Sequence, residues 1–82
     1  VPFNSTSVIS FAIQKQELVK IKIFNTLGKE ITTLLEEEIS PGNHKINWEA
    51  QDQFGNPLSS GVYLICLQTN SGIKTTKTIL LK

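Results

Sequence analysis

Arginine and methionine are absent from this chain of 82 residues, and cysteine occurs only once. All eight basic residues are lysines, and seven acidic residues balance them to a net charge of +1. Proteins that bind nucleic acids commonly use arginine side chains to hold phosphates and guanines, usually within a strongly positive surface. The lack of arginine and of a strong net charge therefore argues against a nucleic-acid partner.

The single cysteine, Cys66, excludes a disulfide within the chain, so the fold must be held together by packing. No apolar run approaches the ~18 residues of a membrane-spanning helix, and no signal peptide precedes the first strand. Because the first residue is Val1, we expect a piece of a longer protein whose natural C-terminus could be Lys82. The length and the hydrophobic content of 39% predict one globular domain over residues 1–82.

Apolar and polar residues alternate along several short segments, which is typical of strands with one buried face. The clearest alternation places Val19, Ile21 and Ile23 on one face, with Lys20 and Lys22 on the other. Similar segments lie at 7–13, 43–49, 61–69 and 73–82, and a less regular one lies at 30–36. Turn sequences rich in Gly, Pro and Asn separate them. No helical pattern interrupts them. Residues 36–38 could pass for a helical turn, but we expect a loop or a strand end there. The sequence predicts an all-β fold, an antiparallel β-sandwich of six to seven strands.

The shared register of these segments predicts which side chains form the core. On strand 61–69, Val62, Leu64 and Cys66 would face outward, so Cys66 is expected to be a free and partly covered thiol. The residues expected to be buried together between two sheets are Ile9, Phe11, Ile21, Ile23, Trp48, Tyr63, Ile65 and Ile79.

Four blocks of sequence cover almost the whole chain in an order that is more specific than any one block. They are PFNSTSVISFAI, VKIKIFNTLGKEITTL, PGNHKINWEAQDQFGNPLSSGVYLICL and KTILLK. This arrangement resembles the type IX secretion system C-terminal sorting domain (Por secretion tail), which is related to the immunoglobulin-like domain of the flagellar hook-capping protein. The chain departs from the usual family residues at Val1, Phe24, Glu49, Ala50 and Cys66, none of which alters the alternation of inward positions.

The resemblance implies an immunoglobulin-like sandwich that acts as a non-catalytic sorting signal. It would direct a covalently attached N-terminal cargo domain through the periplasm and across the outer membrane, to the cell surface or the extracellular space. The implied partners are the secretion translocon and a sortase-like peptidase that removes the domain afterwards. Two alternatives remain open: a structural immunoglobulin-like spacer or assembly domain, and a carbohydrate-binding module. The last would need an exposed aromatic platform that includes Trp48 and Tyr63.

Two groups of residues invite a chemical interpretation. Cys66 and His44 could form a nucleophile–base pair, but such a site also needs an orienting group and an oxyanion hole, so we interpret the chain as no enzyme. Glu49, Asp52 and Asn56 flank one loop and could bind calcium, although their spacing matches no EF-hand loop. Plain capping of the turn by Asp52 is the other interpretation. No cofactor is expected.

The final residues, TKTILLK, raise a separate question because three large aliphatic residues are consecutive. Alternation predicts that Ile79 and Leu81 share an inward face with Lys77, while Leu80 faces the opposite side. Leu80 would then be covered by a loop, or it would belong to an exposed apolar tip that a partner recognises by packing or by strand addition. The candidate recognition tip consists of Lys77, Ile79, Leu80, Leu81 and Lys82, whose free carboxylate would belong to the signal.

Overall fold

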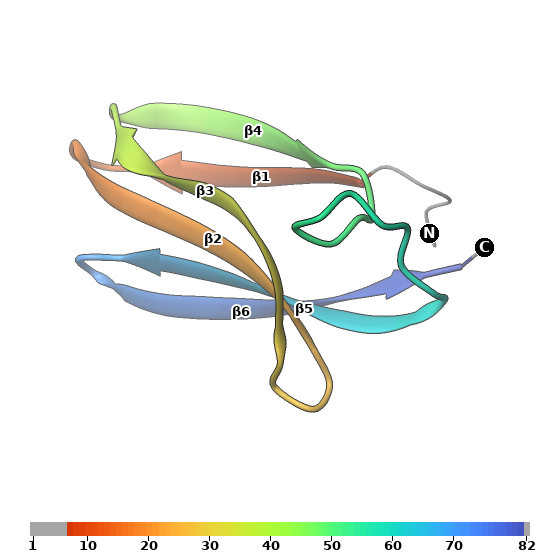
Figure 1. The fold of residues 1–82 in the computed structure, drawn as a ribbon. Coiled ribbons are helices and arrows are strands. Elements are labelled where there is room, and N and C mark those ends of the chain that lie inside the picture. The colour runs from red at the N-terminus through yellow and green to blue at the C-terminus, as the bar shows by residue number, and fades with distance from the viewer. Residues whose placement is uncertain (1–6, 82) are drawn as a thin grey trace.

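The computed structural model describes residues 7–81, which form six strands (Figure 1). None of these residues is helical, so the described part of the chain contains no helix that could cross a membrane. The strands are β1 (Ser7–Ile13), β2 (Glu17–Asn25), β3 (Glu30–Ile39), β4 (Gly42–Trp48), β5 (Gly61–Thr69) and β6 (Gly72–Leu80). The all-β prediction is therefore confirmed, and residues 36–38 belong to the last part of β3.

Two antiparallel sheets lie face to face and form a sandwich (Figure 1). One sheet contains only β1 and β4, and the other has four strands in the order β3-β2-β5-β6. Strands β3 and β6 are therefore the edges of the larger sheet. The pairing of β3 with β2 is irregular. Its register shifts twice, at the β2 positions between Ile21 and Lys22 and between Ile23 and Phe24. These β-bulges explain why residues 30–36 alternate less regularly than the other segments.

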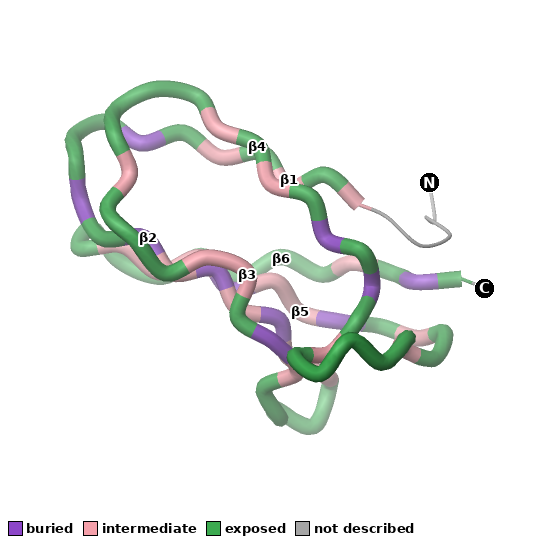
Figure 2. The backbone as a smooth tube through the Cα atoms, turned by 45° about the horizontal axis from the view of Figure 1, so that its top comes forward, coloured by how far each residue is buried: buried purple, intermediate pink, exposed green. Residues whose placement is uncertain are grey.

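The core lies between the two sheets, and a series of its buried positions runs along β2 (Figure 2). Trp48 on β4, Tyr63 on β5 and Leu80 on β6 are buried as well. Of the eight predicted core residues, Ile21, Ile23, Trp48 and Tyr63 are buried. Ile9, Phe11 and Ile65 are half-buried and pack against the buried clusters. The eighth prediction, Ile79, is wrong, because 53% of this residue is exposed.

The error at Ile79 concerns the face that β6 turns toward the core. Strand β6 pairs with β5 so that Thr78 lies opposite Tyr63 and Leu80 lies opposite Gly61. Residues directly opposite each other in a sheet point to the same face, so the inward Tyr63 places Thr78 and Leu80 on the inner face as well. Leu80 is fully buried, at 0% exposure, whereas Leu81 is 49% exposed. Shifting a strand by one residue turns each of its side chains to the opposite face of the sheet. The sequence-based prediction for residues 79–81 was wrong by one such shift.

Candidate recognition site

The predicted recognition tip divides into a buried and an exposed part. Leu80 packs into the core cluster that contains Ile23, Trp48 and Tyr63, so it is not displayed to a partner. Lys77, Ile79 and Leu81 are exposed at the surface. Lys82, the fifth predicted residue, lies outside the described residues. The surface that this end of the chain presents therefore consists of two aliphatic side chains and one lysine.

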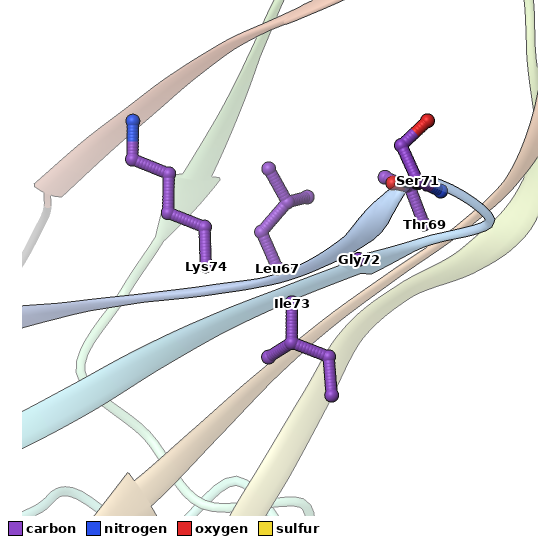
Figure 3. Close-up of a pocket in the computed structure, with 6 residues that line it drawn as sticks. All are labelled: Leu67, Thr69, Ser71, Gly72, Ile73 and Lys74. Atoms are coloured by element: carbon purple, nitrogen blue, oxygen red, sulfur yellow. Dashed lines mark hydrogen bonds between the residues drawn. The ribbon is translucent and has the colours of Figure 1, made fainter.

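The two faces of β6 differ in what surrounds them. At the β5–β6 hairpin, Leu67 and Lys74 point to one side of the sheet and Ile73 points to the other (Figure 3). Lys77 and Ile79 follow Ile73 at even spacing, so they share its face, which is the outer face of the sandwich. Lys74, Thr76 and Thr78 lie on the inner face, along a groove between β6 and β1 that Lys77 of this edge strand also lines. Both faces of β6 are therefore accessible, and apart from Lys77 they present different residues.

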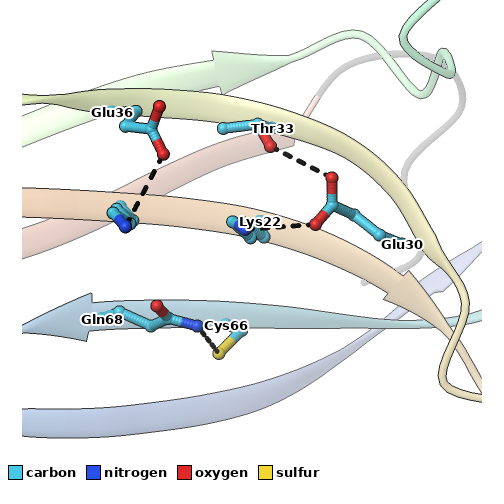
Figure 4. Close-up of polar contacts among 7 residues, drawn as sticks. Lys22, Glu30, Thr33, Glu36, Cys66 and Gln68 are labelled. Carbon is cyan, nitrogen blue, oxygen red and sulfur yellow. Dashed lines mark hydrogen bonds and ion pairs between the residues drawn. The ribbon is translucent and has the colours of Figure 1, made fainter.

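Ion pairs on the outer face are concentrated on β2 and β3 (Figure 4). The Nζ of Lys22 lies 3.2 Å from Oε1 of Glu30, and the Nζ of Lys20 lies 3.8 Å from Oε1 of Glu36. This confirms that Lys20 and Lys22 point outward, as the alternation predicts. Such surface pairs contribute little to stability. They do, however, balance the charges of β2, whereas Lys77 on β6 forms no ion pair with another residue of the 7–81 range.

The aromatic residues Trp48 and Tyr63 form part of the core instead of a surface platform. Their ring centroids are 5.8 Å apart in an edge-to-face arrangement with an interplanar angle of 74°. The Tyr63 hydroxyl donates a hydrogen bond to the Ser59 carbonyl at 2.8 Å, and the Trp48 Nε1–H donates to the Gln51 carbonyl at 3.4 Å. Because Trp48 is only 2% exposed, the carbohydrate-binding alternative loses the aromatic platform on which it depended.

Cys66 and His44 do not meet. His44 lies on β4, where its Nε2 is 2.7 Å from the Ser40 carbonyl oxygen and its ring stacks on Phe11 with centroids 5.5 Å apart. Cys66 lies on the outer face of the other sheet, where the Gln68 Nε2 donates to its Sγ at 3.8 Å (Figure 4). The thiol is free and faces outward, as predicted, but it is buried and not merely partly covered. A nucleophile–base pair of these two residues is therefore not formed.

Asp52 caps the turn that it begins. Its Oδ1 accepts hydrogen bonds from the backbone N–H groups of Phe54 and Asn56, both at 2.9 Å, and its Oδ2 accepts one from the Asn56 side chain at 3.2 Å. The hydrogen bond from the Asn56 backbone N–H is the main reason that the pKa of Asp52 is lower than usual. Desolvation is the next-largest influence and raises the pKa, while the bonds from the Phe54 N–H and the Asn56 side chain lower it further.

This arrangement bears on the calcium alternative. Both Asp52 carboxylate oxygens already accept hydrogen bonds from the turn, and Glu49 is exposed without joining these bonds. Within residues 7–81, no group of three or more His, Cys, Asp and Glu side chains is placed to hold a metal ion. The geometry favours the turn cap over an ion site.

The described strands define the chain as a small antiparallel β-sandwich with an exposed edge strand at its C-terminal end. Residues 1–82 match the family of secretion system C-terminal sorting domains, the Por secretion tail family of type IX secretion, and the chain belongs to this family. No curated protein matches the chain.

A solved structure shows the same fold. The chain is similar to part of dimeric latent PorU from Porphyromonas gingivalis, whose crystal structure superimposes with a TM-score of 0.72 at 15% sequence identity. The alignment covers 98% of this chain but only 8% of the PorU chain. At this level of identity, the likeness concerns the fold alone.

Proposed function

We propose that this chain is a sorting signal that directs an attached N-terminal cargo domain across the outer membrane by the type IX secretion system. The observation that carries the proposal is the family match over residues 1–82. We further propose that these residues make up one domain, which is exported with its cargo to the cell surface or extracellular space and is then removed by a sortase-like peptidase. The alternative that remains is a structural spacer within a multidomain extracellular protein.

The proposed mechanism is recognition by binding and involves no chemistry on the part of this domain. A partner in the secretion translocon would contact the exposed residues at the end of β6, which are Lys77, Ile79 and Leu81. Leu80 supports this surface from within, because its burial fixes the strand on the core. Lys82, which lies outside the described residues, remains part of the proposed signal.

A fusion experiment tests the proposal. Residues 1–82 are joined to the C-terminus of a periplasmic reporter and expressed in a host that carries this secretion system, with a translocon-deficient strain as control. The expected result is reporter on the cell surface or in the medium of the competent strain, and reporter retained in the periplasm of the deficient strain. A folded fusion that stays in the periplasm of both strains would contradict a sorting function and favour a spacer.

A further inference from the structure

An apolar cluster lies on the outer face of the four-stranded sheet, beside the end of β6. We call it the outer patch and define it as Phe24, Val62, Leu64 and Ile79. Phe24 lies opposite Leu64, and Val62 lies opposite Ile79, in neighbouring strands. Since Val62 and Leu64 are two residues apart on β5, all four side chains are neighbours on one face. No single strand could reveal the patch, because its members come from β2, β5 and β6.

The outer patch is accessible to a partner. Ile79 is 53% exposed and Val62 is 38% exposed, while Phe24 and Leu64 are half-buried beside them. Farther along the same face, the surface is occupied by ion-paired Lys20 and Lys22 and by Gln68, which covers Cys66 (Figure 4). Leu18 and Ile73 are also exposed at the other end of this face, but the four residues of the outer patch are cross-strand neighbours at the end where the chain leaves β6. Contiguous apolar surface of this kind often marks a contact site for another protein.

The charge beside the outer patch indicates the chemistry of the partner. Lys77 lies directly opposite Leu64, is exposed, and has no ion pair with another described residue. Lys22, on the other side of the patch, is already paired with Glu30. An apolar contact at the patch would therefore bring to its rim one ammonium group that no residue of the 7–81 range pairs with, and a carboxylate on the partner would complement it.

The size of the outer patch indicates the kind of contact. A stable protein interface involves ~20–30 residues on each side, whereas the outer patch and Lys77 amount to five residues. A contact made by these five residues alone is too small to hold two copies in a permanent dimer, but it suits a weak and reversible interaction. A signal that is recognised during transport and then released needs a contact of this kind.

We propose that the outer patch and Lys77 form a docking face for a protein of the secretion machinery, one that presents an apolar surface with an acidic rim. This inference rests on the proposed sorting function and deepens it, because it assigns recognition to one face of β6 and extends it onto β2 and β5. The inner face of β6, with Lys74 and the two threonines, takes no part.

Strand β6 offers matched variants for the test. Ile79→Thr removes an apolar contact from the outer patch, and Ile73→Thr makes the same change on the same face of β6 but opposite Gln68, away from the patch. Lys77→Glu reverses the charge at the rim, and Lys74→Glu reverses a charge on the inner face of the same strand. All four positions are exposed, so the changes differ in location more than in burial.

The reporter fusion described above supplies the measurement. Ile79→Thr and Lys77→Glu are each expected to lower export about tenfold, which corresponds to a loss of about 1.4 kcal/mol of binding free energy. Ile73→Thr and Lys74→Glu are expected to leave export near that of the unchanged fusion. Urea midpoints, followed by Trp48 fluorescence, establish that each variant is folded, and Val62→Thr replaces Ile79→Thr if the latter is unfolded.

Three outcomes would overturn the docking face. The first is normal export of the folded Ile79→Thr and Lys77→Glu variants, and the second is an equal loss of export in the two control variants. The third is a stable dimer of the isolated domain that Ile79→Thr dissociates, because the patch would then belong to a second copy. Failure of the unchanged fusion to be exported would instead count against the sorting function itself.

Discussion

At the scale of single residues, three consecutive aliphatic side chains at the end of the chain have different roles. Leu80 is fully buried among Ile23, Trp48 and Tyr63, while its neighbours Ile79 and Leu81 are about half exposed. Burial of an aliphatic side chain is worth much more to stability than a partly exposed position on a sheet surface. Leu80 therefore contributes to stability, whereas the recognition proposed above would depend on its exposed neighbours in the same short segment.

Substitutions at these positions test that division. Leu80→Ala is expected to lower the free energy of unfolding by ~2–5 kcal/mol, because it removes a side chain from a packed core and leaves a cavity. Leu81→Ala is expected to cost less than ~1 kcal/mol, because that side chain is half in water already. Urea unfolding followed by Trp48 fluorescence gives both values. Equal losses at the two positions would contradict the observed orientation of β6.

Asp52 shows how one side chain can organise a loop. Its carboxylate accepts three hydrogen bonds from Phe54 and Asn56, which lower the pKa of Asp52 in the folded protein. A group whose pKa is lower when folded adds stability above its unfolded pKa, which is ~3.9 for an aspartate. That contribution is lost as the pH falls through the lower pKa of the folded state.

The variant Asp52→Asn is expected to have a weaker acid dependence of stability. Asparagine keeps an acceptor oxygen but carries no charge, so the variant is less stable than the unchanged protein near neutral pH. The difference shrinks as the pH falls below the unfolded-state pKa of ~3.9 and through the lower pKa of the folded state. Thermal midpoints measured across this range check the expectation. A difference that stays constant with pH would show that the Asp52 charge does not contribute.

At the scale of elements, a buried acidic residue fixes the hairpin between β5 and β6. Glu17, at the start of β2, is only 6% exposed, and its Oε1 accepts a hydrogen bond from the Asn70 backbone N–H at 2.7 Å. Asn70 occupies the two-residue turn of the hairpin, far from Glu17 in sequence. This bond connects the turn to the neighbouring strand and so helps to hold β6 at the edge of the sheet.

Removal of this bond is expected to loosen the turn. Glu17→Ala leaves the Asn70 N–H without its partner, at a cost of ~1–3 kcal/mol, and should speed hydrogen exchange of the Asn70 amide. Glu17→Gln keeps an acceptor oxygen at the same reach and should have a smaller effect. Unchanged exchange at Asn70 in Glu17→Ala would mean that the turn is held by other contacts.

At the scale of the whole molecule, a sheet of two strands covers one of four. The two buried clusters share half-buried neighbours, since Ile9, Leu34 and Ile65 pack against both. Because the two clusters share these residues, we expect them to unfold together and not one after the other. The same connection links the exposed end of β6 to the rest of the protein through Leu80.

We accordingly expect residues 1–82 to unfold as one cooperative unit. Urea transitions followed by Trp48 fluorescence, which reports on the core, and by far-UV circular dichroism, which reports on the strands, should coincide. Leu80→Ala should shift both transitions together. Two separate transitions would contradict the proposal of a single domain.

The sequence alone determined the strands and most of the core. Alternation with a period of two identified the strand pattern, and it placed Ile21, Ile23 and Trp48 inward because the intervening residues are polar. The same alternation placed Lys20 and Lys22 on the outer face, and Cys66 followed from the assignment of Tyr63 and Ile65 to the core. The order of the sequence blocks also indicated the family, which the family match confirms.

Only the tertiary structure decided which side chains at the end of the chain lie at the surface. Residues 79–81 are all apolar, so local pattern gives no preference for either face, and the pairing of β6 with the inward Tyr63 makes the choice. The outer patch is also invisible to the sequence, because strand order brings Phe24, Leu64 and Ile79 together from three separate segments. Local chemistry fixes which residues can form a strand, whereas cross-strand pairing fixes which side of that strand meets the solvent.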